Sequence, residues 1–111
     1  MEIHEQRHGA VKVLRPQGPL IQTDADAVRT RLLEELSQTM GRLVLDASAI
    51  PYVDSCGLEV LVDVTDEMSK SGQALKLCCV NDTVREVLDL TDLASMFEQF
   101  EDVQTAVRSF L

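Results

Sequence analysis

A short apolar run at residues 42–46 is the feature that most constrains how this chain can fold. The segment reads Arg42-Leu43-Val44-Leu45-Asp46, with large apolar side chains at consecutive positions and a charged residue at each end. It follows Gly41, which favours the end of a preceding helix. A continuous apolar run of this length is typical of a strand buried on both faces, as in parallel sheets covered by helices. The sequence therefore predicts an α/β fold in which 42–46 is the central strand.

The rest of the chain alternates between strand and helix patterns. Residues 2–7 and 10–15 predict an antiparallel hairpin with a turn at His8-Gly9. Pro16 and Gly18-Pro19 are expected to end its hydrogen-bond ladder, because proline has no backbone donor. The other expected elements are a helix from Thr23 or Asp24 to about Gln38, a helix over 58–69, a strand over 74–80, a helix from Asn81 or Asp82 onward, a short strand near Met96-Phe97 and a last helix carrying Val103, Ala106, Val107 and Phe110.

This order, β-β-α-β-α-β-α-β-α, implies right-handed crossovers and a mostly parallel sheet. The N-terminal hairpin adds an antiparallel edge, and the helices pack on the sheet. The length of 111 residues fits one domain spanning 1–111. We expect that domain to be a monomer.

The composition excludes several classes of partner. A net charge of −9 repels phosphate backbones and anionic lipid headgroups, so neither nucleic acid nor a membrane surface is an expected partner. No apolar stretch is long enough to span a bilayer, and the N-terminus lacks a basic region followed by an apolar one. These features predict a cytoplasmic protein.

The residues that commonly carry chemistry form no recognised catalytic or metal-binding pattern. The three cysteines are an odd number, and Cys78 and Cys79 are adjacent in an apolar strand, so buried reduced thiols are expected rather than disulfides. His4 and His8 would lie about 13 Å apart along a strand, too far to share a metal ion. No nucleotide-binding or nucleophile motif is present. We therefore expect no metal, no cofactor and no enzyme activity.

The segment Asp54-Ser55-Cys56-Gly57 lies where the loop after the central strand turns into a helix. Such loops, beyond the carboxyl ends of parallel strands, commonly hold functional sites. Ser55 has two interpretations: a helix N-cap only, or a functional serine whose phosphorylated form is tolerated at the positive end of a helix. Cys56 is expected to pack or cap locally, although a helix N-terminus can also make a thiol reactive.

These residues carry a resemblance to a known family. Leu43-Val44-Leu45-Asp46, Ile50 and the run Tyr52-Val53-Asp54-Ser55-Cys56-Gly57-Leu58 resemble the anti-sigma-factor antagonists of the STAS family, in which Asp-Ser-Ser/Thr-Gly-Leu follows a strand and a short loop. Gly72, and Leu88-Asp89-Leu90-Thr91-Asp92-Leu93, are similar to further family segments. The element order and the length also agree with the STAS fold.

The resemblance implies a function for this corner of the chain. In that family the serine after the aspartate is phosphorylated by an anti-sigma factor that is also a serine kinase of the GHKL type, and a PP2C-type phosphatase removes the phosphate. Ser55 is then the acceptor, and its free form binds the kinase while its phosphorylated form does not. The nucleotide belongs to the kinase, so this chain needs no cofactor. The residues implied in partner binding are Asp54, Ser55, Cys56, Gly57, Leu58, Leu20 and Asp24.

The chain departs from the family pattern in three places. Cys56 stands where the family has Ser or Thr, and the family's glycine is missing from Thr91-Asp92-Leu93. Gly18-Pro19-Leu20-Ile21 replaces Gly-Glu-Leu/Ile-Asp, which removes an acidic residue that Asp24 or Asp26 could replace. Two other functions stay open: a non-catalytic STAS scaffold subunit of a transporter or stress-sensing complex, and thiol-based sensing through Cys56.

Overall fold

The computed structural model of the protein describes all residues, 1–111, and contains one five-stranded sheet in the order β1-β2-β3-β4-β5. β1 and β2 are antiparallel, and each later neighbour pairs in parallel. The elements are β1 (Glu2–His8), β2 (Val11–Gln17), α1 (Gln22–Thr39), β3 (Leu43–Asp46), α2 (Ser55–Ser69), β4 (Lys76–Cys78), α3 (Asp82–Leu90), a 3-10 turn (Ala94–Met96), β5 (Glu98–Phe100) and α4 (Val103–Arg108). The predicted α/β class, element order and central position of 42–46 are confirmed.

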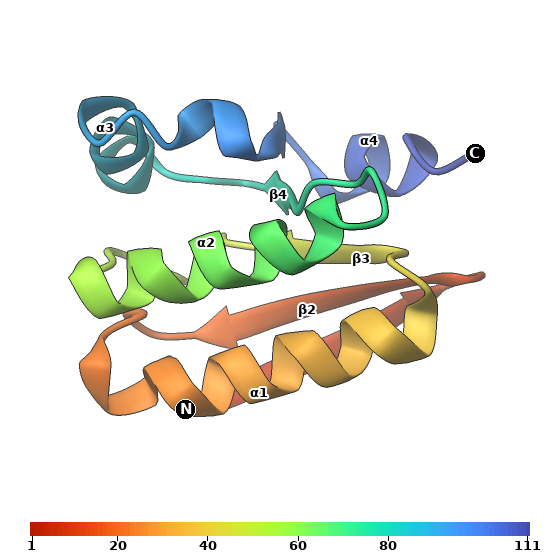
Figure 1. Cartoon of the computed structure of the whole chain (residues 1–111), viewed down its shortest axis with the longest axis horizontal. Coiled ribbons are helices and arrows are strands. Elements are labelled where there is room, and N and C mark those ends of the chain that lie inside the picture. The colour runs from red at the N-terminus through yellow and green to blue at the C-terminus, as the bar shows by residue number, and fades with distance from the viewer.

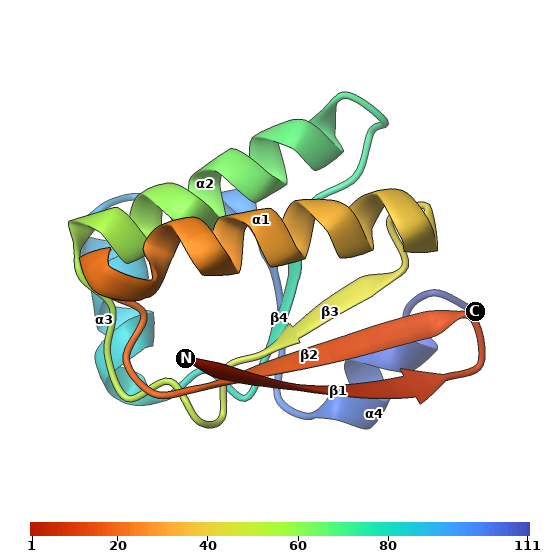
Figure 2. The same ribbon diagram turned by 90° about the horizontal axis from the view of Figure 1, so that it is seen from below.

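The helices cover the sheet unequally. Helices α1 and α2 lie side by side on one face, and α4 lies on the other, as Figures 1 and 2 show. The larger apolar cluster fills the space between the sheet and α1, α2 and α3, and a smaller one joins α4 to the opposite face. The second cluster comprises Val11, Val13, Val44, Cys78 and Ala106. None of the helices combines the length and the apolar character needed to cross a membrane.

The predicted end of the hairpin ladder at Pro16 is wrong. Pro16 lies inside β2 and pairs with Ile3 of β1. The backbone amides of Lys12 and Gly18 donate hydrogen bonds to carbonyl groups on the side of β2 where β3 and its following loop lie. Alternate residues of a strand face the same way, so the nitrogen of Pro16 points to that side, where pairing with β3 ends at Leu14. No ladder bond is lost at a proline in that position.

Two strands near the C-terminus differ from their predicted positions. β4 is shorter than the predicted 74–80 because Cys79 adopts a left-handed φ of 61°, and Leu75 donates its amide to the Thr65 hydroxyl. The short strand predicted near Met96-Phe97 begins at Glu98. Met96 belongs to the 3-10 turn, and its carbonyl accepts a hydrogen bond from the same Thr65 hydroxyl at 2.9 Å. The Thr65 side chain of α2 thus forms hydrogen bonds with the backbone of Leu75 and Met96, two residues that the apolar pattern assigned to strands.

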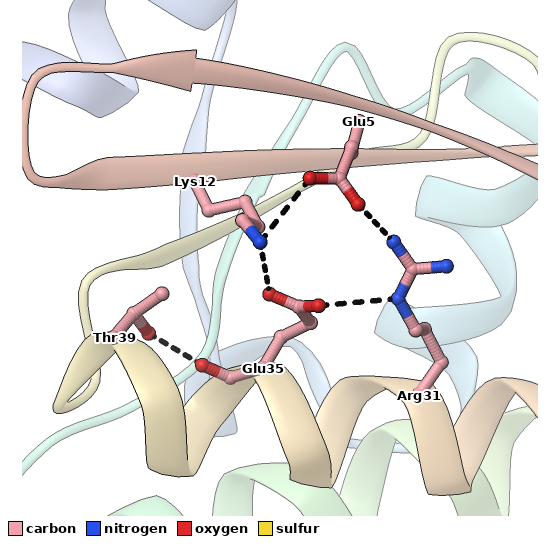
Figure 3. Close-up of polar contacts among 5 residues, drawn as sticks. All are labelled: Glu5, Lys12, Arg31, Glu35 and Thr39. Atoms are coloured by element: carbon pink, nitrogen blue, oxygen red, sulfur yellow. Dashed lines mark hydrogen bonds and ion pairs between the residues drawn. The ribbon is translucent and has the colours of Figure 1, made fainter.

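A charged network joins α1 to the N-terminal hairpin (Figure 3). Lys12 and Glu35 are each only 6% exposed, and Lys12 Nζ lies 2.7 Å from Glu35 Oε2. Glu5 accepts from Lys12 at 3.2 Å and also pairs with Arg31, which in turn contacts Glu35 at 3.3 Å. Thr39 donates to the Glu35 carbonyl at 2.7 Å. Because each buried charge has an opposite partner, the network avoids the cost of an isolated buried ion.

Candidate functional site at the start of helix α2

The backbone of the loop between β3 and α2 is held on both sides by contacts with other segments of the chain. On one side, the Asn81 side-chain amide donates to the carbonyls of Ile50 and Pro51 at 3.3 and 3.1 Å. On the other side, Leu20 and Val53 form an isolated parallel bridge. These contacts fix the loop against the starts of α3 and α1, so the first turn of α2 begins from a rigid support.

Asp54 caps two helices at once. Its Oδ1 accepts a hydrogen bond from the Gly57 amide of α2 at 2.9 Å. Its Oδ2 accepts one from the Gln22 amide, the first residue of α1, at 3.0 Å. The N-cap residue of α1, Ile21, has no capping side chain of its own. The hydrogen bond from Gly57, together with the one from Gln22, lowers the pKa of Asp54 despite partial desolvation, so the carboxylate is charged at neutral pH.

Ser55 is the first residue of α2 and is exposed to solvent. The interpretation of Ser55 as only an N-cap is wrong, because Asp54 is the N-cap and supplies the capping oxygen. None of the side-chain hydrogen bonds within the chain uses the Ser55 hydroxyl. The hydroxyl is therefore free to meet another molecule.

Gly57 permits close contact between α2 and the segment before α1. A Cβ added at Gly57 would overlap the carbonyl oxygen of Leu20. Leu20 itself has no exposed surface, and Gly57 is buried. Leu20 and Gly57 are therefore enclosed in the free protein, and both residues position the site from inside the fold.

The surface beside Ser55 is formed by the facing sides of α1 and α2. Cys56 and Leu58 are half-buried and pack against the core, so neither is a freely exposed side chain. Between the two helices lies a shallow hollow of about 270 Å³. It is lined by Gln22, Ala25, Asp26, Arg29, Cys56 and Glu59. The hollow brings the Cys56 thiol and the charged side chain of Glu59, both on α2, together with charged side chains of α1.

The two acids considered as substitutes for the missing family residue occupy different positions. Asp24 is half-buried in the first turn of α1, and its carboxylate lies 3.4 Å from the α-amino nitrogen of Met1. Asp26 is exposed, lines the hollow and pairs with Arg29 at 2.9 Å. Arg29 also contacts Asp63 of α2 at 3.0 Å. The structure therefore brings Asp26, rather than Asp24, into the hollow that Cys56 lines.

Sequence reasoning missed Gln22, Arg29 and Glu59 as neighbours of the site. Glu59 could have been found, because residues four apart share one face of a helix and Glu59 follows Ser55 by that spacing. The role of Gln22 depends on its backbone amide and carries no sequence signal. Arg29 becomes a neighbour only because α1 packs beside α2.

Comparison with known proteins identifies one family. The model of the STAS domain matches residues 2–106. BtrV of Bordetella bronchiseptica, named as an anti-sigma factor antagonist, is 27% identical over 94 residues, covering 85% of this chain and 81% of BtrV. An anti-sigma F factor antagonist of Paenibacillus polymyxa is 24% identical over 108 residues, covering 96% of this chain and 92% of that protein.

Solved structures agree with the fold. The crystal structure of an anti-sigma factor antagonist from Thermotoga maritima superposes with a TM-score of 0.88 at 24% identity, covering 96% of this chain and 92% of that one. The phosphorylated form of the Bacillus cell fate determinant SpoIIAA gives 0.72 at 15% identity, covering 99% and 100%. Part of the murine anion transporter Slc26a9 gives 0.75 at 18% identity, covering 95% of this chain and 18% of the transporter.

Proposed function

The chain belongs to the STAS domain family, and from this premise we propose that it is a cytoplasmic anti-sigma factor antagonist that works by partner switching. Relatives that match most of the chain are anti-sigma factor antagonists by name. In its free form the protein binds an anti-sigma factor that is also a GHKL-type serine kinase, and thereby frees a sigma factor or another target. Phosphorylation of Ser55 ends that binding, and a PP2C-type phosphatase restores it. The protein is the substrate of the kinase and not a catalyst.

The observation that carries this proposal is the exposed and unbonded hydroxyl of Ser55 at the first residue of α2. Asp54 has already taken the capping role, so modification of Ser55 breaks no hydrogen bond of the fold. A helix N-terminus also favours added negative charge. We therefore expect the phosphorylated domain to stay folded.

Loss of binding follows from the charges next to Ser55. Asp54 precedes it, and Glu59 lies one helical turn further on the same side of α2. A phosphate adds about −1.5 to −2 charge to this acidic corner. A partner surface that fits a small hydroxyl would have to desolvate that charge without an opposing group, which weakens binding strongly.

The first experiment is a phosphorylation assay with the cognate kinase and ATP, read by intact mass. We expect a gain of one phosphoryl group in the wild type and in Ser71→Ala, which removes an exposed serine beyond the far end of α2. Ser55→Ala should show no gain. A phosphoryl group on Ser55→Ala, or none on the wild type in a kinase preparation active on another substrate, would contradict the proposal.

A second candidate function is a scaffold role in a transporter or stress-sensing complex. The fold match to part of an anion transporter favours it, as does the absence of the family's acidic residue at Ile21. Purification of the chain from its own cells distinguishes the two functions. Recovery of a serine kinase supports the switch, whereas recovery of a transporter subunit with no kinase supports the scaffold.

A further inference from the structure

Two thiols and a carboxylate lie together at the carboxyl ends of β3 and β4, on the face of the sheet that α4 covers. Asp46 ends β3 and is paired in register with Cys78, which ends β4. Cys79 follows directly. One carboxylate oxygen and the two Sγ atoms all lie within 4.8 Å of one another.

The backbone at Cys79 is what brings the second thiol into this group. In a regular strand, neighbouring side chains point to opposite faces of the sheet. Cys79 instead has a φ of 61°, a conformation that few residues other than glycine adopt. Its amide donates to Phe100 at 3.2 Å, which holds this conformation against the end of β5. Because of the turn, Cys78 and Cys79 both contribute to the smaller apolar cluster, instead of lying on opposite faces.

The group has acidic character and no basic partner. Asp46 forms no salt bridge, and its Oδ1 accepts a hydrogen bond from the Ser48 amide at 2.9 Å. Burial raises the pKa of both thiols, and the charges of Asp46 and Asp102 raise each of them further. A cation placed among the three side chains would relieve the repulsion that opposes their ionisation.

We propose that Asp46, Cys78 and Cys79 form a binding site for a divalent metal ion of the Zn²⁺ type. Thiolate and carboxylate ligands suit this ion, with metal–ligand distances of about 2.3 Å to sulfur and about 2.0–2.2 Å to oxygen. Ligand atoms around a tetrahedral ion then lie roughly 3.5 Å apart, so closure requires only a small shift from the present arrangement. On binding, each thiol releases its proton to solvent as its sulfur–metal bond forms.

The site has one free coordination position and a route of entry. Three protein ligands leave the fourth tetrahedral position for water or for an added ligand. Cys79 is half-buried rather than enclosed. Asp46 also lines a hollow of about 360 Å³ together with side chains of the N-terminal hairpin, among them His4 and Arg15. This site is independent of Ser55, which begins a helix on the opposite face of the sheet.

The test uses the reduced, tag-free full chain and two metal probes. Zn²⁺ binding is measured by titration calorimetry, and Co²⁺ binding is followed by the absorption band that thiolate ligands give to that ion. We expect one ion per chain, release of protons on binding, and affinity that increases with pH as Cys78 and Cys79 lose their protons more readily. Asp46 and Asp102 are the other acidic groups facing the thiols.

Substitutions separate this site from other thiols. Cys79→Ser and Asp46→Asn should each weaken Zn²⁺ binding by at least about tenfold, whereas Cys56→Ser should leave it unchanged because Cys56 lies in α2 away from the group. Circular dichroism of each variant is the control for folding. The inference is overturned if the wild type binds no Zn²⁺, if Co²⁺ gives no thiolate band, or if Cys56→Ser weakens binding as much as Cys79→Ser.

Discussion

Asp54 accepts a hydrogen bond of 3.0 Å from the backbone amide of Gln22, a residue that precedes it by 32 positions. Through this bond the N-cap of α2 also caps α1, which lacks a capping side chain of its own. The residue beside the proposed phosphorylation site therefore belongs to the framework that joins two helices to the sheet. A partner that recognises this corner meets a surface that is preformed in the free protein.

Substitution of Asp54 tests this double cap. Asp54→Ala removes both hydrogen bonds, and we expect a clear fall in the urea midpoint. Asp54→Asn retains an acceptor oxygen for one amide, so its midpoint should lie between those of Asp54→Ala and the wild type. Equal midpoints for all three proteins would show that the cap contributes nothing to stability.

The same carboxylate predicts a pH dependence. The pKa of Asp54 is lower in the folded protein than in the unfolded chain, so its contribution is present above its unfolded pKa and is lost as the pH falls through the folded pKa. Urea midpoints measured between about pH 7 and pH 3 should therefore fall less steeply for Asp54→Asn than for the wild type. Parallel curves would exclude Asp54 as a source of acid sensitivity.

Gly57→Ala tests the close contact between α2 and Leu20. The added methyl group would overlap the Leu20 carbonyl oxygen, which is backbone and cannot rotate away. We expect a loss of about 1–3 kcal/mol in the free energy of unfolding, as for other overpacked sites. Ser55→Ala, two residues earlier and exposed, is the control and should stay within about 0.5 kcal/mol of the wild type. A Gly57→Ala variant as stable as this control would contradict the packing described.

Glu35→Gln tests the buried network of Figure 3. Burial opposes ionisation of Glu35, but the hydrogen bond and charge of Lys12, followed by those of Arg31, hold the pKa of Glu35 below its ordinary value. Loss of the charge leaves Lys12 with Glu5 as its only anionic partner. We expect a cost of about 1–3 kcal/mol at neutral pH that becomes smaller in acid, where the wild-type contribution is also lost. Glu34→Gln, an exposed neighbour, is the matched control and should change stability by less than about 0.5 kcal/mol.

Cys56→Ser tests whether partner binding depends on the thiol. The substitution restores the residue found in the family and keeps a small polar side chain, so we expect affinity for the kinase within a few-fold of the wild type. Complete loss of kinase binding, with an unchanged melting temperature, would favour thiol-based sensing instead.

The sequence predicted the order of the elements because each apolar pattern reflects a local period. It located the corner at Asp54 to Leu58 because loops beyond the carboxyl ends of parallel strands commonly hold functional sites, and because this run resembles the STAS family. It left open whether Ser55 is only an N-cap, since both Asp and Ser are good N-caps and only the backbone geometry decides between them.

Other features depended on contacts between distant segments. The Thr65 hydroxyl forms hydrogen bonds with backbone groups of Leu75 and Met96, so β4 is shorter and β5 begins later than the apolar pattern predicts. Pro16 removes no ladder bond because the pairing of β2 with β3 ends at Leu14. The left-handed turn at Cys79 places adjacent cysteines in one group, against the alternation that a strand pattern assumes. None of these contacts produces a periodic pattern of residues that sequence analysis could detect.

The most direct test of the switch is the affinity of the cognate kinase for the wild type, Ser55→Ala and Ser55→Glu, measured by calorimetry, with the melting temperature of each protein as the control for folding. We predict similar affinities for the wild type and Ser55→Ala. Binding of Ser55→Glu should be at least about tenfold weaker with an almost unchanged melting temperature, because the added charge is accepted by the helix N-terminus but not by the partner. Equal affinities for all three proteins would contradict the account and leave Ser55 without a regulatory role.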